Sequence, residues 1–415
     1  MDTDDIFNQF MEKSLFKDKS SLQFSYTPDT ILHREEQINQ IAKILAPSLR
    51  MEKPSNLFLY GKTGTGKTLT TRYVEQKLLE KAEKSNLKFL KIVYINCKLK
   101  KVADTEYRIL AEILKELGVE VPATGLPTDQ LYKKFVNYLE EDERLMILIF
   151  DEIDQAVKKI GDELLYNLTR LNSSFKKSQI SFIGISNDLI FVENLDPRVK
   201  SSLGEEEIVF PPYDAIQLKD ILEQRMKKAF KNGVVAKGVI DKCAAYAAHE
   251  HGDARRALEL IRVAGELVER EGKDKITIEY LDKSQEKIEK DRVLGVIETQ
   301  PKQFQLTLLA IMNKLRSISN GTKLFTSDIY EEYNILCRKT RLKPLTQRRI
   351  GDIIAEFDML GIINATVISK GRYGRTREIR LAISREMIKK ADSLLKESLN
   401  LKDIGINTKI TDYAG

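Results

Sequence analysis

The sequence predicts an α/β fold: a parallel β-sheet buried between helices, then an all-helical domain, then a small domain that ends in a basic β-hairpin. Three observations lead to this prediction. Short apolar runs alternate with amphipathic stretches up to residue 210, strand patterns stop after Pro211 and Pro212, and three helical patterns near the C-terminus precede two short strands. Buried strands separated by helices are typical of a parallel sheet covered on both faces.

The strands of the expected sheet are five runs rich in β-branched and aromatic residues, at 57–60, 92–95, 146–150, 180–185 and 208–210. From Asp214 to about Lys290 the apolar spacing is helical. We therefore expect five parts: a flexible N-terminal segment at 1–25, a sheet core at 26–212, a helical domain at 213–291, a third domain at 292–398 and a tail at 399–415.

The third domain has helical patterns near 302–319, 326–340 and 346–360, followed by strands near 362–368 and 376–383. Three helices followed by a glycine-containing basic hairpin is the order of a winged helix. Eleven Lys or Arg against four Asp or Glu lie between Arg338 and Leu381, whereas the whole chain has a net charge of only +6. This local excess indicates a nucleic-acid-binding module, and a merely solvated basic face is the alternative.

The composition of the 415 residues argues against membrane and metal-cluster proteins. The longest apolar run, Leu145 to Phe150, is far shorter than the roughly 18 residues of a spanning helix, and the N-terminus is acidic rather than signal-like. Three cysteines and three histidines lie too far apart to form a zinc site. We expect a cytoplasmic protein with reduced cysteines and no membrane contact.

The strongest motif is Gly61-Lys62-Thr63-Gly64-Thr65-Gly66-Lys67-Thr68, a full match to the phosphate-loop pattern G-x-x-x-x-G-K-S/T between a strand and a helix. Glycines let backbone N–H groups converge on a phosphate, and the N-terminus of the following helix attracts it further. We expect Lys67 to reach the β- and γ-phosphates of ATP and Thr68 to ligate Mg²⁺.

A second motif, Asp151-Glu152-Ile153-Asp154, follows the longest apolar run. An acid at the carboxyl end of a central strand can hold Mg²⁺ through its water shell, so Asp151 is the second metal residue. Glu152 can orient or deprotonate the attacking water. A plain helix N-cap is the alternative for such an acid pair.

With these motifs the chain resembles the AAA+ ATPases, and more closely the archaeal initiators related to origin recognition complex and cell-division-cycle proteins. The resemblance covers about residues 25–385, and its further motifs lie at 184–188, 196–203, 252–258, 346–349 and 371–374. It implies an AAA+ P-loop sheet core, an all-helical lid domain and a C-terminal winged-helix domain. It also implies an ATPase that turns over slowly, as a switch.

The resemblance assigns sensor roles to two residues. Asn187 looks like the first sensor, a strand-end amide near the γ-phosphate, although it could be a plain turn residue. Arg255 looks like the second sensor, a lid arginine that touches the γ-phosphate. An ion pair of Arg255 with Glu259 on the helix surface is the alternative, and Arg256 competes for the same role.

Arg198 looks like an arginine finger offered to a neighbouring subunit, although Asp196 and Pro197 would also make an ordinary helix start. Residues 31–34 resemble the family's adenine-side segment, with His33 alternatively a surface histidine, and Tyr213 resembles the start of the lid contact. The residues expected to bind ATP or ADP are Ile31, Leu32, His33, Arg34, Gly61, Thr63, Gly64, Thr65, Gly66, Lys67, Thr68, Leu69, Tyr213 and Arg255.

The expected DNA contacts lie on the third helix of the winged helix and on its wing. Thr346 is a suitable N-cap, and Arg348 and Asp352 project from the face opposite the apolar one, where they could face a major groove or simply pair. The residues expected to bind DNA are Thr346, Gln347, Arg348, Arg349, Lys370, Gly371, Arg372, Tyr373, Gly374 and Arg375. The resemblance implies a further DNA-facing insertion within 100–130, with 121–126 as the candidate loop.

We therefore expect an ATP-dependent DNA replication initiator that binds duplex origin DNA through its winged helix and AAA+ core. The resemblance implies other initiator subunits and the replicative helicase as partners, and a location on the nucleoid. Two other functions fit the same domains: a DNA motor of the branch-migration type and an ATP-gated transcription regulator.

Overall fold

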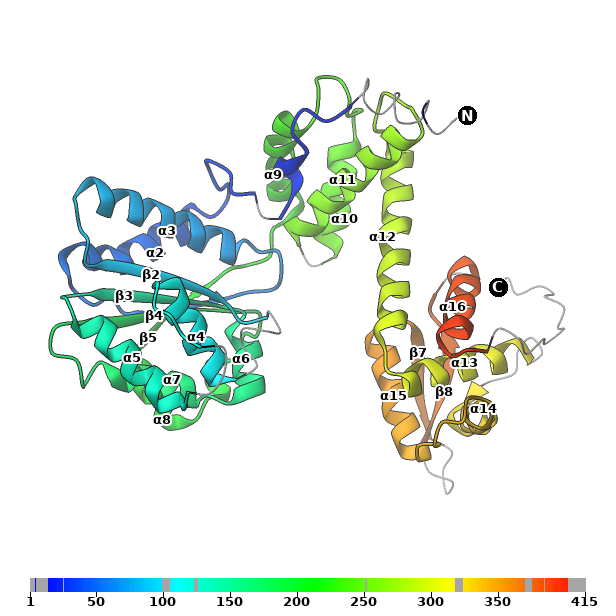
Figure 1. Ribbon diagram of the computed structural model, residues 1–415. Coiled ribbons are helices and arrows are strands. Elements are labelled where there is room, and N and C mark those ends of the chain that lie inside the picture. Colours follow the sequence, from blue (N-terminus) through cyan, green and yellow to red (C-terminus); the bar gives the residue numbers. More distant parts are fainter. Residues whose placement is uncertain are drawn as a thin grey trace. The chain divides into compact units, whose positions relative to one another are not determined.

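The computed structural model describes residues 4, 14–24, 26–98, 105–122, 126–250, 252–317, 324–369, 375–383 and 385–401 (Figure 1). The chain divides into two compact units, residues 1–284 and residues 285–415. Among the helices in the described ranges, none combines the length and apolar character needed to cross a bilayer.

The core of the first unit is a parallel sheet of five strands in the order β2-β3-β4-β1-β5. This confirms the predicted α/β fold, and each of the five apolar runs forms a strand. Both faces of β1 and β3 are buried, because helices cover the sheet on both sides. The strands are β1 (Asn56–Tyr60), β2 (Leu90–Asn96), β3 (Leu145–Asp151), β4 (Gln179–Ser186) and β5 (Glu205–Val209).

Two helical layers cover this sheet (Figure 1). One face packs on α2 (Glu35–Leu45) and α3 (Lys67–Lys84), through Ile41, Val74 and Leu78. The other face packs on α4 (Glu106–Glu116), α5 (Thr128–Glu140), α6 (Ile153–Ile160), α7 (Glu163–Leu171) and α8 (Pro197–Leu203). Short 3₁₀ turns lie at η2 (Ala46–Arg50) and η3 (Val192–Asn194). The carboxyl ends of β1 and β3 carry the phosphate loop and the acidic motif to one edge of the sheet.

The helical domain follows directly after β5. It consists of α9 (Ala215–Ala229), α10 (Val239–His249), α11 (Ala254–Arg270) and the start of α12 (Ile278–Thr299). Asp214 caps α9 in a capping box with Gln217, and Asp253 caps α11 by accepting hydrogen bonds from two backbone N–H groups. The domain boundary expected at 291–292 falls inside α12, which is one continuous helix.

The prediction of a flexible N-terminal segment at 1–25 is wrong for residues 14–24. Here Leu15, Phe16 and Leu22 are buried, and the 3₁₀ turn η1 (Lys19–Leu22) packs on the lid helix α9. The backbone N–H of Lys17 donates to the carbonyl of Ala229 at 2.7 Å. The segment is ordered because its apolar side chains complete the core of the lid. This contact joins residues far apart in the sequence, so local apolar periodicity does not predict it.

The second unit is a winged helix, as predicted. Its helices are α13 (Lys302–Ser317), α14 (Thr326–Thr340) and α15 (Gln347–Met359), and its sheet is ordered β6-β8-β7, from β6 (Leu324–Phe325), β7 (Ile363–Ser369) and β8 (Arg375–Leu381). The sequence reading missed β6 and the C-terminal helix α16 (Arg385–Ser398). Ala391 and Leu395 of α16 are fully buried in the core of this unit, so the helix is part of the fold.

Candidate nucleotide site

The phosphate loop connects β1 to α3 and is shaped by glycines that no other residue could replace without strain. Gly64 and Gly66 have φ of +76° and +92°, in the left-handed region. A Cβ on Gly64 would lie 1.7 Å from Oδ1 of Asp253 in the lid, and one on Gly66 would lie 2.7 Å from the Tyr213 hydroxyl. The loop therefore needs glycine both for its backbone turns and for its close contact with the lid.

Lys67 is buried at the start of α3 and points into the loop. Its Nζ donates to the carbonyls of Gly61 and Lys62 at 2.6 and 2.9 Å and to Oδ1 of Asn187 at 2.9 Å. Burial lowers the pKa of the Lys67 ammonium to about 8; Asp151 opposes this shift and Arg255 adds to it. The Lys67 ammonium therefore lies within the phosphate loop, next to the side-chain amide of Asn187, for which the resemblance implies the role of first sensor.

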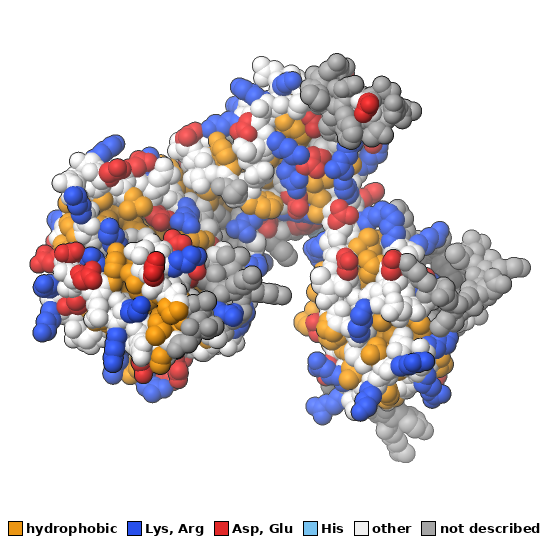
Figure 2. Space-filling view, in the orientation of Figure 1, with side chains coloured by type: hydrophobic (Ala, Val, Ile, Leu, Met, Phe, Trp, Pro, Cys, Tyr) orange, Lys and Arg blue, Asp and Glu red, His pale blue; other side chains and the backbone are white. Residues whose placement is uncertain are grey.

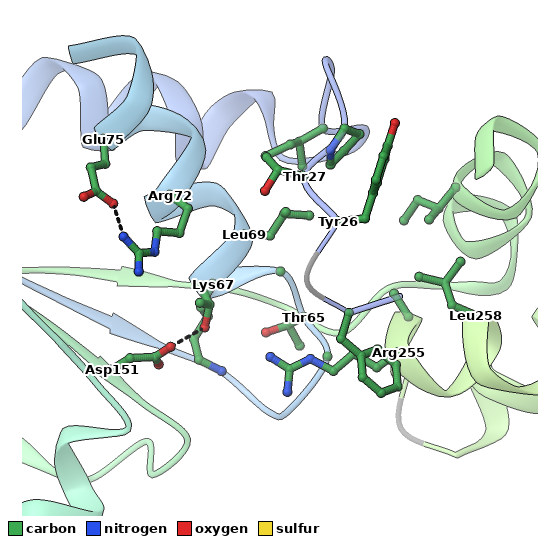
Figure 3. A pocket seen from close by; sticks show the side chains of 18 of the residues that line it. Tyr26, Thr27, Thr65, Lys67, Leu69, Arg72, Glu75, Asp151, Arg255 and Leu258 are labelled. Atoms are coloured by element: carbon green, nitrogen blue, oxygen red, sulfur yellow. Dashed lines mark hydrogen bonds and ion pairs between the residues drawn. The ribbon is translucent and has the colours of Figure 1, made fainter. Parts of the chain in front are cut away.

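Asp151 ends β3 directly beside the loop. Its Oδ2 accepts a hydrogen bond from Oγ1 of Thr68 at 2.9 Å, so the two predicted metal residues are brought together. In Figure 3 this contact is the dashed line that starts at Asp151. A carboxylate and a hydroxyl are hard oxygen donors, and Mg²⁺ is usually held by one or two carboxylates together with substrate phosphates. The donor set therefore fits Mg²⁺.

Glu152 follows with a left-handed backbone, φ 55° and ψ 44°, and precedes α6. A non-glycine residue in this region is uncommon, and such strain is concentrated at functional sites. The turn brings the Glu152 side chain within 3.3 Å of Nζ of Lys98, an ion pair at the end of β2. Glu152 occupies the N-cap position of α6, the alternative role for this acid pair, but its side chain makes no capping hydrogen bond. Asp154 behind it is buried and accepts hydrogen bonds from Gln155 and Ser186.

The lid contributes Arg255 from the first turn of α11. Arg255 lines the cleft above the phosphate loop, and the backbone N–H of Ala254 donates to the carbonyl of Gly64 at 3.3 Å. Its competitor Arg256 is engaged elsewhere, because its guanidinium pairs with Glu250 at 2.8 Å and with Glu259 at 3.7 Å. The helix-surface pair with Glu259 therefore belongs to Arg256, and Arg255 is the lid arginine that faces the site.

Core and lid enclose a cleft of about 970 Å³. Figure 3 shows Lys67 and Asp151 on the core side, Leu258 and Arg255 on the lid side, and Tyr26 and Thr27 from the N-terminal segment. Of the residues expected to bind nucleotide, the lining includes Ile31, Leu32, Thr63, Gly64, Thr65, Gly66, Lys67, Thr68, Leu69, Tyr213 and Arg255. The sequence analysis did not predict Tyr26, Thr27, Ile221 and Gln224, which come from segments it did not connect to the site, or Leu258, which lies on the same helix as Arg255.

His33 and Arg34 are placed beside the cleft rather than in its wall. Arg34 is buried, and its guanidinium donates to the carbonyls of Thr65 at 2.9 Å and Pro211 at 2.6 Å while it stacks 3.8 Å from the Tyr213 ring centroid. Arg34 thus connects the phosphate loop, at Thr65, to the segment that leads into the lid, at Pro211. The His33 imidazole instead lies 2.9 Å from Asp220 on α9.

Arg198 lies on α8, outside the cleft lining. The Asp196 side chain caps α8 and also pairs with the Arg198 guanidinium at 3.0 Å, and the Arg198 side chain is 77% exposed. This is the ordinary helix start that the sequence allowed. The exposure also leaves the guanidinium accessible from outside the chain, so its role as a finger stays a prediction.

In the second unit, the first turn of α15 is open to solvent. The Thr346 side chain caps the helix, and Thr346, Gln347, Arg348 and Arg349 are all exposed. Arg349 pairs with Asp352 at 3.6 Å, so the pair expected for Arg348 is made by its neighbour. Residues 370–374 of the wing lie outside the described residues, as does the side chain of Arg375. In Figure 2, Lys and Arg side chains surround the end of this unit that holds α14 and α15.

The chain combines a parallel sheet of strand order β2-β3-β4-β1-β5 with a phosphate loop that a helical lid covers. This combination defines an AAA+ ATPase. Comparisons with known proteins agree. Three family models match in succession: an AAA domain at residues 50–189, a Cdc6 AAA+ ATPase-type lid domain at 219–286 and a CDC6 C-terminal winged helix domain at 295–391.

Two relatives match almost the whole chain. An ORC1-type DNA replication protein 1 of Methanosarcina mazei is 50% identical over 97% of this chain and 95% of its own length. An ORC1-type DNA replication protein of Pyrococcus furiosus is 53% identical over 92% and 90%. A solved structure of the Aeropyrum pernix ORC1 protein in complex with DNA has a TM-score of 0.82 and 44% identity, over 93% of this chain and 98% of that one. The chain therefore belongs to the ORC1/Cdc6-type archaeal DNA replication initiators.

Proposed function

We propose that this initiator binds duplex origin DNA through its winged helix and AAA+ core, and that ATP and Mg²⁺ in the core–lid cleft control the binding. The exposed first turn of α15 is the observation that carries the DNA part of the proposal. A similar protein points the same way, since the Aeropyrum pernix ORC1 protein has been solved in complex with DNA. Such a protein would reside on the nucleoid in the cytoplasm.

The nucleotide chemistry follows from the side chains around the loop. Lys67 offers an ammonium to the β- and γ-phosphates, and Thr68 and Asp151 offer oxygen ligands for Mg²⁺, which when bound would neutralise phosphate charge. Glu152 would orient or deprotonate the attacking water. Its ion pair with Lys98 competes with that task, in keeping with slow, switch-like turnover.

Arg255 and Asn187 would report the nucleotide state to the rest of the chain. Arg255 stands on the lid and Asn187 on the core, and both border the same cleft. A γ-phosphate would attract the Arg255 guanidinium and hold the lid helix α11 against the loop. Loss of the γ-phosphate would remove that attraction, so hydrolysis would loosen the lid.

The DNA side is proposed from exposure and charge. Gln347, Arg348 and Arg349 occupy the N-terminal turn of a helix whose opposite face, with Ile350 and Ile353, is buried. Side chains at the start of a recognition helix usually meet bases or phosphates in the major groove. The wing and the insertion within 100–130 would add DNA contacts.

In an assembly with other initiator subunits, Arg198 would reach the nucleotide of a neighbouring subunit. The assembly would then recruit the replicative helicase.

The DNA role is tested by Arg348→Ala, with Lys389→Ala on α16 as a control that removes the same charge from the same unit. We expect Arg348→Ala to weaken binding to an origin fragment and to lower the slope of log K against log salt by ~0.9 for each lost phosphate contact. The measurement is fluorescence anisotropy with labelled duplex at several salt concentrations. If the two variants had the same affinity for the fragment and the same salt slope, α15 would not be part of the DNA interface.

The same protein distinguishes an initiator from a DNA motor. A motor should hydrolyse ATP continuously and speed up strongly on long duplex of any sequence. An initiator should prefer its origin and gain little ATPase activity. Steady-state ATPase with and without random duplex decides between them, and strong stimulation without sequence preference would favour the motor.

A further inference from the structure

The carboxylate of Asp151 receives a second hydrogen bond that the phosphate-loop and acidic motifs do not account for. Tyr94 of β2 donates its hydroxyl to Oδ2 of Asp151, the same oxygen that accepts from Thr68. Among the described residues, none donates a hydrogen bond to the other oxygen, Oδ1. The two hydroxyls thus hold one edge of the carboxylate and leave the other edge free.

The position of Tyr94 follows from the register of the sheet. Tyr94 is paired with Ile149 and Asn96 with Asp151, so Tyr94 and Asp151 lie on the same face, the one covered by α3. The neighbouring residues Val93 and Ile95 point to the opposite face and are buried in its core. Tyr94 is therefore directed to the carboxylate by strand alternation.

Arg72 of α3 holds the Tyr94 ring in place. Its guanidinium carbon lies 3.3 Å from the centroid of the Tyr94 ring. Its Nη1 donates to Glu75 at 2.9 Å, an ion pair drawn as a dashed line in Figure 3. A planar guanidinium on an aromatic face is a favourable cation–π arrangement. Because Thr68 and Arg72 are one turn apart on α3, the helix contacts the carboxylate directly and again through the tyrosine.

We propose that Tyr94 is a positioning residue for the Mg²⁺ carboxylate. This inference rests on the proposed nucleotide function. A carboxylate held by Thr68 alone can still rotate about its terminal bond, whereas a second donor on the same oxygen fixes the plane of the group. The free oxygen Oδ1 is then presented in one direction to the water shell of the cation. Outer groups that orient metal ligands in this way typically contribute 10–100-fold to metal affinity.

The test is Tyr94→Phe in the full-length chain, with Tyr73→Phe as the matched control. Tyr73 is a partly buried tyrosine on α3 outside the cleft lining, and like Tyr94 it packs against the core between the sheet and α3, so its variant loses a hydroxyl of the same kind in a similar setting. Binding of a fluorescent ATP analogue is titrated with Mg²⁺ and, separately, measured in EDTA. We expect Tyr94→Phe to raise the half-saturating Mg²⁺ concentration about tenfold and to leave binding in EDTA unchanged.

A second variant, Arg72→Lys, keeps the charge beside Glu75 but loses the planar stack on the ring, and we expect a smaller rise in the same direction. A Mg²⁺ midpoint of Tyr94→Phe equal to that of Tyr73→Phe would overturn the proposal. So would an equal loss of binding with Mg²⁺ and in EDTA, because that is the result of a merely structural role. Failure of the unsubstituted chain to bind the analogue at all would instead overturn the proposed nucleotide function.

Discussion

The pH dependence of nucleotide binding is a direct consequence of how Lys67 is buried. Removal of its ammonium from water lowers the Lys67 pKa to about 8, even though the Asp151 carboxylate pulls in the other direction. Only the protonated ammonium attracts phosphates, and a bound polyphosphate would hold that proton. Nucleotide affinity should therefore be at its highest and constant well below pH 8, and it should fall as the pH rises through 8.

The magnitude follows from the position of the pKa. At pH 7 about nine tenths of the Lys67 side chains carry the proton, and at pH 9 only about one tenth do. The apparent affinity should therefore fall about tenfold between these values, or ~1.4 kcal/mol. The assay is equilibrium binding of a fluorescent ADP at constant ionic strength from pH 6.5 to 9.5.

Lys67→Arg provides the control, because a guanidinium does not lose its proton in this range. Its affinity should be lower at pH 7 but should not change between pH 7 and 9. A dissociation constant of the unsubstituted chain that is equal at pH 7 and 9 would refute the reasoning, since it would mean that the ammonium is not the group that loses its proton near the phosphates.

Three further outcomes follow from contacts around the lid. Gly64→Ala should abolish tight nucleotide binding with an unchanged far-UV circular dichroism spectrum, because the new methyl group collides with Asp253 at a backbone angle that alanine avoids; retained affinity would contradict this. Asp253→Ala should lower the free energy of unfolding by about 1 kcal/mol through loss of the α11 cap, as read from urea denaturation, and an unchanged midpoint would count against it. Leu22→Ala should lower the free energy of unfolding of the first unit by about 2–5 kcal/mol, whereas a loosely held segment would show no change.

The sequence was sufficient for the sheet and for the phosphate loop, for a physical reason. Strands buried on both faces must be continuously apolar, as from Leu145 to Phe150, and a phosphate cradle must be rich in glycine. Both constraints are local, so they can be read residue by residue. The N-cap of α15 at Thr346 was predictable in the same way.

Other features depend on contacts between distant segments, which one sequence does not reveal. Arg255 and Arg256 both follow the Asp253 cap, and only the docking of α11 on Gly64 decides which of them faces the cleft. Ile31 and Leu32 of the expected adenine-side segment line the cleft, whereas the tertiary fold turns the Arg34 side chain to carbonyls behind the loop. Tyr94 could have been noticed, because it is a hydroxyl-bearing residue on the same strand face as Asn96.

The central claim is that the nucleotide in the cleft governs how the chain binds duplex DNA. The most direct measurement compares the affinity for an origin fragment and for a shuffled fragment of equal length, with ATP or ADP bound, in the unsubstituted chain and in Lys67→Ala. We predict a preference for the origin that changes with the nucleotide, and no such change in Lys67→Ala. Equal affinity for the two fragments in every nucleotide state would contradict the account.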